Sequence, residues 1–132
     1  MNLIFFPFER VIEINAFILE TEQGMKGSAD LNKLQGALGR IDNAIAYSGL
    51  DDVFEIAAKY AGSIAVSHSL SDANKRTGLA VALEYLSLND YELVVDNDLF
   101  ADAMRDLVVG KIGESDFADL LYAQFIQEQN TH

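Results

Sequence analysis

Residues 51–76 read DDVFEIAAKYAGSIAVSHSLSDANKR, and this stretch predicts a buried helix that leads into a polar loop. Asp51 and Asp52 favour a helix start, because the N-terminal end of a helix carries partial positive charge. Small and apolar residues then recur at steps of three and four, which places them on one face. Small side chains allow a neighbouring helix to approach closely, so we predict that this helix is central and buried and runs to about His68. The stripe consists of Phe54, Ala58, Ala61 and Ala65, and then His68.

The rest of the chain shows helical spacing of apolar residues, which predicts an all-α bundle of about six helices in a single domain, residues 1–132. The expected helices lie at about 7–21, 30–47, 51–68, 75–88, 97–109 and 114–127, with a short extended piece at 91–95. Asp30 is the expected cap of the second helix, and Asn89-Asp90 is the expected end of the fourth. The expected inner faces are Val11, Ile14, Phe17 and Ile18 in the first helix, Leu31, Leu34, Leu38 and Ile41 in the second, and Leu79, Leu83 and Leu86 in the fourth.

Composition and charge narrow the class of protein. Half of the 132 residues are apolar, which is enough for one core. The absence of cysteine favours a reducing cytoplasm. The net charge of −12 repels a nucleic-acid backbone, so direct binding of nucleic acid is not expected. No apolar run reaches the roughly 20 residues needed to span a bilayer, so no membrane association is expected.

His68 is a candidate general base at the end of the predicted central helix. An imidazole has an ordinary pKa of about 6.5, so it can accept a proton near neutral pH. The alternative for an isolated histidine is a structural role, in which it is bonded to a carbonyl in the core. Residue type and position alone do not decide between the two.

Lys75 and Arg76 form an adjacent basic pair at the start of the fourth predicted helix. Cations are unfavourable there because the helix terminus is already positive, and a bound anion would resolve the conflict. Arginine adds a fork of donors that suits phosphate, and lysine adds a point charge. The pair therefore predicts a phosphate site, and the alternative is pairing with local acids such as Asp72.

Asp72 and Asn74 lie between the candidate base and the cations. A carboxylate beside a phosphate site is a common ligand of Mg²⁺. The alternative for each residue is a structural role. Asp72 could cap the helix instead of binding a metal, and Asn74 could cap it instead of donating to phosphate. Together with His68, Lys75 and Arg76, these side chains suit phosphoryl or nucleotidyl transfer, in which positioning and charge stabilisation provide most of the catalysis.

The run from His68 to Thr77, HSLSDANKRT, resembles the signature of the Fic/Doc family, His-x-Phe-x-Asp/Glu-x-Asn-Lys/Gly-Arg. Lysine before the arginine points to the death-on-curing (Doc) branch. The similarity covers most of the chain, including the segment around 24–38, the helix around 54–58 and the turn Asn89-Asp90-Tyr91, where the family has Asn-Gly-Tyr.

The resemblance implies a small helical bundle with the motif loop between two central helices. It implies a cytoplasmic enzyme that uses ATP and Mg²⁺ to modify a hydroxyl of a target protein. In the Doc branch the modification is phosphorylation, the associated target is translation elongation factor Tu, the outcome is growth arrest, and a separately encoded antitoxin restrains the toxin. The implied roles are general base for His68, Mg²⁺ ligand for Asp72, phosphate binding for Asn74, Lys75, Arg76 and Thr77, and target positioning for Gly24, Met25, Lys26 and Gly27.

Two residues depart from the family pattern. Leu70 stands where phenylalanine anchors the motif, and Ser69 stands where a bulkier residue or proline is common. No glutamate is followed by glycine or asparagine, so the self-inhibiting helix of many Fic proteins is missing and restraint would come from another chain. Two alternatives remain beside phosphorylation. The first is AMP transfer by the same site, and the second is an idle domain that serves as a binding module, which the change at Leu70 would favour.

Overall fold

The computed structural model describes residues 6–21, 30–67 and 74–130, and within these ranges every regular element is a helix. The all-α fold predicted from the sequence is confirmed. The helices are α1 (Phe8–Thr21), α2 (Leu31–Tyr47), α3 (Val53–Val66), α4 (Asn74–Leu88), α5 (Asn97–Val108) and α6 (Glu114–Asn130).

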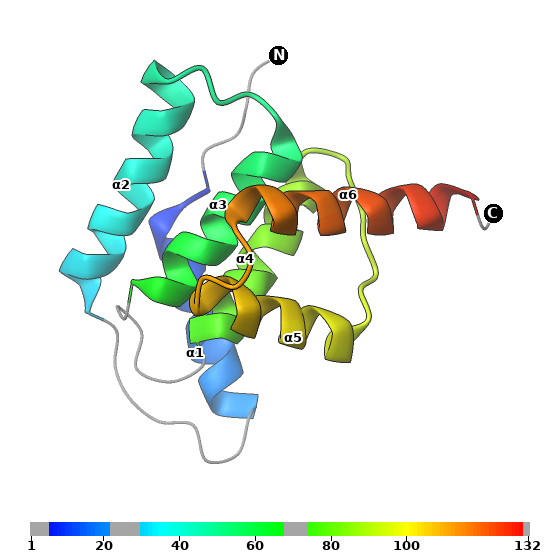
Figure 1. Cartoon of the computed structure of the whole chain (residues 1–132). Helices are drawn as coiled ribbons and strands as arrows, with labels where there is room; N and C mark the ends of the chain where they lie inside the picture. The colour runs from blue at the N-terminus through cyan, green and yellow to red at the C-terminus, as the bar shows by residue number, and fades with distance from the viewer. Residues whose placement is uncertain (1–5, 22–29, 68–73, 131–132) are drawn as a thin grey trace.

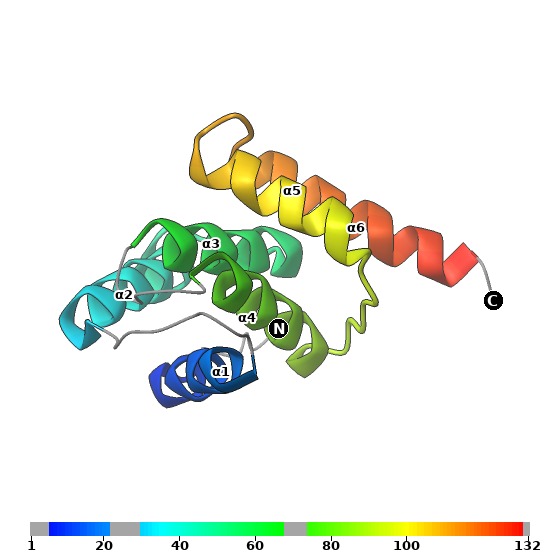
Figure 2. The ribbon, with the colours of Figure 1, turned by 90° about the horizontal axis from the view of Figure 1, so that it is seen from below.

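Helix α3 lies at the centre of the bundle and packs against α2, α4, α5 and α6 (Figure 1). Helix α1 lies against α4 on one side of the central helices, and α5 and α6 lie on the other side (Figure 2). The last two helices run antiparallel to each other, and the end of α6 extends beyond the bundle. No helix in the described ranges has the length and apolar character needed to cross a bilayer.

The burial of α3 confirms that it is the central helix. The predicted stripe of Phe54, Ala58, Ala61 and Ala65 is buried, and most of the rest of the helix is buried too, apart from a face that carries Glu55, Lys59, Ser63 and Val66. Asp52 caps its N-terminus, and its carboxylate accepts hydrogen bonds from the backbone N–H groups of Phe54 and Glu55 at 2.8 and 3.0 Å. The other buried residues of α3 are Val53, Ile56, Ala57, Tyr60, Gly62 and Ile64.

Helix α3 ends at Val66 rather than running to His68. The hydroxyl of Ser67 donates to the carbonyl of Ile64 at 2.9 Å. Such local side-chain bonds compete with the helical ladder, which gives a physical reason for the earlier end.

A glycine brings α4 against α3 at close range. A Cβ atom at Gly78 would lie 2.6 Å from the carbonyl oxygen of Ala61, closer than real Cβ atoms come to other groups. It would also lie 3.3 Å from Cε of Met104 on α5. Gly78 therefore sets the spacing of three helices at once.

Several predicted core positions are corrected by this packing. Phe17 is 65% exposed and Leu31 is 49% exposed, so neither belongs to the core. Leu79 and Leu83 are only partly buried, because α4 turns a different face to the core. That face, centred on the glycine contact, carries Thr77, Gly78, Val81, Ala82, Tyr85 and Leu86.

The ends of α2 and α4 follow the predicted signals. Asp30 caps α2 by accepting from the N–H of Lys33 at 3.2 Å. Helix α4 ends at Leu88, and Asp90 adopts a positive φ of 71° in the turn that follows. The expected extended piece at 91–95 forms no strand. Instead, α6 holds its backbone, with Gln124 donating to the carbonyl of Val94 at 3.0 Å.

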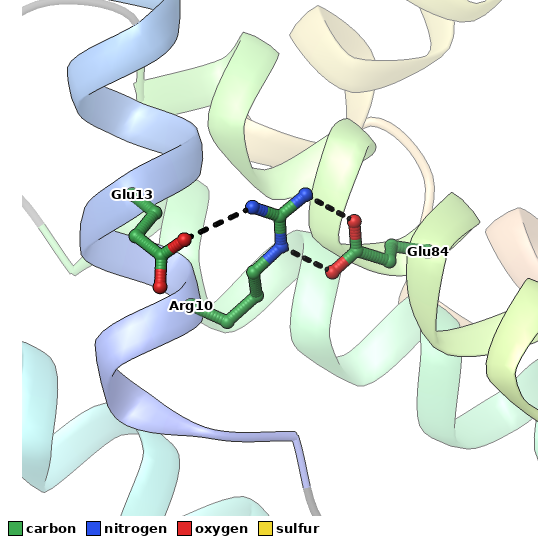
Figure 3. Close-up of polar contacts among 3 residues, drawn as sticks. All are labelled: Arg10, Glu13 and Glu84. Atoms are coloured by element: carbon green, nitrogen blue, oxygen red, sulfur yellow. Dashed lines mark hydrogen bonds and ion pairs between the residues drawn. The ribbon is translucent and has the colours of Figure 1, made fainter.

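An ion pair joins α1 to α4 on the side away from α5 (Figure 3). Arg10 donates from Nε and Nη2 to the two carboxylate oxygens of Glu84, both at 2.6 Å. A third contact runs from Nη1 of Arg10 to Glu13 at 3.3 Å. The hydrogen bonds to Glu84 raise the pKa of Arg10 above its ordinary value. This forked geometry fixes the register of α1 along α4.

Candidate active site

The sequence motif divides between described and undescribed parts of the chain. His68, Asp72 and the loop predicted to position the target, Gly24–Gly27, lie outside the described residues, as do Ser69 and Leu70. Asn74, Lys75, Arg76 and Thr77 form the first turn of α4. The candidate site is therefore built here from the start of α4 and from the helices that pack beside it.

The first turn of α4 has the electrostatic character expected of an anion site. It contains no acidic residue, whereas Lys75 and Arg76 both have exposed side chains there. The positive end of the helix dipole adds to their charge. A phosphate at this end of α4 would be attracted by both cations and by the helix terminus.

A pocket of about 580 Å³ lies between the start of α4 and one face of α5. Three cations line it, and they are Lys75, Arg76 and, from α5, Arg105. Asp98 is the acid among the lining residues. The apolar lining comes from Leu79, Ala101 and the buried Met104. An anionic ligand with an apolar portion fits this combination.

Asn74 begins α4 beside the cations. Its side-chain oxygen is buried and has no hydrogen-bond partner within the described chain. A buried polar atom without a partner costs about 1–3 kcal/mol. A donor on a ligand or on a neighbouring segment would remove that cost, so the atom is suited to a polar contact at this end of the helix.

Thr77 has a different position from the other motif residues. Its side chain is fully buried, and its hydroxyl accepts a hydrogen bond from Nδ2 of Asn15 on α1 at 3.2 Å. It is not among the residues that line the α4–α5 pocket. In this structure Thr77 joins α4 to α1, and the phosphate role expected from the motif stays a prediction.

The sequence analysis did not identify Arg105, which the fold brings to the α4–α5 pocket. Its carboxylate partner is Asp102, one turn earlier on α5. From Glu84 onward the chain has eleven acids but only Arg105 and Lys111 as basic residues. The sequence shows the charge of Arg105 and its helical spacing from Asp98 and Ala101. It does not show how α5 packs against α4, which is what places Arg105 in the pocket.

Two other pockets have different chemistry. One, of about 410 Å³, is lined by Asp51, Asp52, Glu55 and Asp119 together with aromatic residues, and its charge would repel a phosphate. The other lies between α1 and α4 and includes the ion pair of Arg10 with Glu84. The α4–α5 pocket is the better candidate for an anionic substrate.

Comparison with known proteins agrees with the motif and with the fold. A sequence model of the Fic/DOC family matches residues 5–86, which is more than half of the chain. The chain is also 33% identical over 113 residues to "Protein kinase doc" of Escherichia phage P1. That alignment covers 86% of this chain and 89% of the phage protein. The match extends well beyond the motif, and the chain belongs to the Fic/Doc family.

Proposed function

We propose that this protein is a Doc-like phosphotransferase, which transfers the γ-phosphoryl group of ATP to a hydroxyl of a target protein. The observation that carries the proposal is the pair Lys75 and Arg76, exposed at an acid-free helix start and lining a pocket large enough for a nucleotide. The relationship to a protein kinase supports phosphoryl rather than AMP transfer.

In the proposed reaction, His68 accepts the proton of the target hydroxyl as its oxygen attacks the γ-phosphorus. The new bond joins that oxygen to phosphorus, and the bond from phosphorus to the bridging oxygen of ADP breaks. ADP carries away the electron pair, and the phosphorylated protein is the second product. Lys75 and Arg76 hold phosphate oxygens throughout, so charge that develops on them is met by donors already in place.

Asp72 is the proposed ligand for Mg²⁺, which would supply further positive charge next to the phosphates. In the described ranges no group of three or more acidic or histidine side chains is arranged to hold a metal ion. A nucleotide-dependent site needs no such group, because Mg²⁺ commonly takes one or two carboxylates and completes its shell with phosphate oxygens and water. The assignment of Asp72 rests on the family motif.

The proposed biological role is that of a toxin that slows translation in the cytoplasm. Elongation factor Tu is the proposed target, and the proposed restraint is an antitoxin encoded separately. The Fic/Doc motif and the missing self-inhibiting sequence support this part of the proposal. Expression without an antitoxin should then arrest growth by slowing translation.

The decisive experiment is the intact mass of elongation factor Tu after incubation with this protein, ATP and Mg²⁺. A gain of one phosphate that is absent with His68→Ala supports the proposal. A gain of one AMP would replace it with AMP transfer. No gain over a range of targets and nucleotides would overturn it in favour of an idle binding domain. Circular dichroism of His68→Ala distinguishes loss of a base from loss of the fold.

The phosphate role of Arg76 can be measured without a known target. We expect Arg76→Gln to weaken ATP binding at least about tenfold, because a hydrogen bond to a charged group contributes roughly 1.5–3 kcal/mol. Lys111→Gln is the matched control, since it removes the same charge from an exposed residue that does not line the pocket. Equal affinity of the two variants in isothermal titration calorimetry would contradict the role.

A further inference from the structure

We propose that Arg105 of α5 is a third phosphate-binding residue of the site, which exchanges Asp102 for a phosphate when a nucleotide binds. This inference rests on the proposed function, because it concerns the substrate of the same pocket. It adds a cation that lies outside the motif and is supplied by a different helix.

Two observations place Arg105 at the motif site. It lines the same pocket as Lys75 and Arg76, so cations from α4 and from α5 border one cavity. It also lies on the face of α5 that carries Asp98 and Ala101, which line the pocket at helical spacing. A phosphate between the two helices would therefore meet positive charge from both.

The present partner of Arg105 is weakly held. The side chains of Arg105 and Asp102 are 60% and 65% exposed, and they are three residues apart on one helix. Exposed pairs of this kind contribute little to stability. A phosphate offers more negative charge and a geometry that matches the guanidinium fork, so the exchange is favourable.

The apolar part of the pocket suggests how the ligand is oriented. Leu79 and Met104 line it beside the cations. A base or ribose can rest on the partly exposed Leu79 while the phosphates reach the basic residues. Arg105 then distinguishes ligands by their phosphates, so its removal should weaken binding of ATP or inorganic triphosphate and leave adenosine unaffected.

The test is isothermal titration calorimetry of the full chain with ATP and Mg²⁺, inorganic triphosphate, and adenosine. We expect Arg105→Gln to weaken binding of ATP and of triphosphate about tenfold, which corresponds to about 1.4 kcal/mol. Arg105→Lys should keep part of the affinity, because it retains the charge but not the fork. Lys111→Gln should change affinity less than twofold.

A second pair of variants tests the exchange itself. Asp102→Asn frees Arg105 and should strengthen triphosphate binding. Asp119→Asn removes the same charge from an exposed residue of α6 that does not line this pocket, and it should have a smaller effect. If Asp102→Asn changed affinity no more than Asp119→Asn, no exchange would take place and the proposal would be wrong.

The outcomes separate this inference from the proposed function. If Arg76→Gln lost affinity while Arg105→Gln matched Lys111→Gln, Arg105 would be only a surface cation and the motif site would stand. If Arg105→Gln weakened triphosphate binding but no target gained mass, the phosphate role of Arg105 would be supported and the proposed phosphoryl transfer would be wrong. If neither ATP nor triphosphate bound, both proposals would be overturned. Circular dichroism of each variant, with Arg105→Lys as the conservative change, excludes unfolding as the cause.

Discussion

The substitution Gly78→Ala tests the helix packing that positions the candidate site. The added Cβ would lie 2.6 Å from the backbone oxygen of Ala61, about 0.8 Å inside ordinary van der Waals contact at 3.4 Å. Neither group can rotate away, because one belongs to the α4 backbone and the other to the α3 backbone. Relief therefore requires α4 to move away from α3.

The magnitude follows from two opposing effects. Alanine is favoured over glycine in a helix interior by about 1 kcal/mol. Overpacking of a tight core costs typically about 1–3 kcal/mol, and a contact between two backbones belongs near the upper end. We therefore expect Gly78→Ala to lower the free energy of unfolding by about 1–2 kcal/mol.

Gly39 provides the matched control, because it lies within α2 and a Cβ there would meet nothing within 4 Å. Gly39→Ala should gain up to about 1 kcal/mol from helix propensity alone. Urea unfolding followed by far-ultraviolet circular dichroism measures both variants at one pH and temperature. If Gly78→Ala were as stable as the parent or more stable, the close approach would not limit the packing and our reasoning would be wrong.

Two further predictions concern ionisable groups whose pKa is raised by burial. Burial raises the pKa of Asp42, and its Oδ1 has no hydrogen-bond partner in the described chain. Its contribution to stability is therefore lost as pH rises through the raised pKa, so Asp42→Asn should be more stable than the parent at pH 7, with no gain below about pH 4. Burial also raises the pKa of Tyr85 to about 12, so its stability contribution is constant below about pH 10 and is lost between there and pH 12. Tyr85→Phe should reduce the loss of stability between pH 8 and pH 11 by about 1.4 kcal/mol. Urea unfolding across pH checks both predictions, and a pH-independent difference from the parent would refute either one.

The starts of α2 and α3 and the turn after α4 were predictable because their causes are local. Asp30 and Asp52 accept hydrogen bonds from the first turns of α2 and α3, as their type and place in the sequence indicate. The turn after α4 depends on Asp90, whose short polar side chain tolerates a positive φ. Each signal involves residues within a few positions of one another, so no knowledge of the tertiary fold was needed.

The inner face of α4 was not predictable in the same way. Leucine spacing favoured a face through Leu79 and Leu83, but the structure buries the face around Gly78. A glycine contributes almost nothing to an apolar pattern, yet it allows the closest approach between helices. The face that is buried was decided by how near two backbones could come rather than by which side chains were most apolar.

The candidate site shows the same division between local and tertiary causes. Lys75 and Arg76 could be found from the sequence, because their conflict with the helix terminus is a local one. Arg105 could not, because it reaches the pocket only through the packing of α5 against α4. Gly78 connects the two, since it lies two residues after Arg76 and a Cβ added there would lie 3.3 Å from Cε of Met104, which lines the pocket with Arg105. A larger residue at Gly78 would therefore displace Lys75 and Arg76 on α4 relative to Arg105 on α5. Gly78→Ala should thus weaken triphosphate binding as well as lower stability.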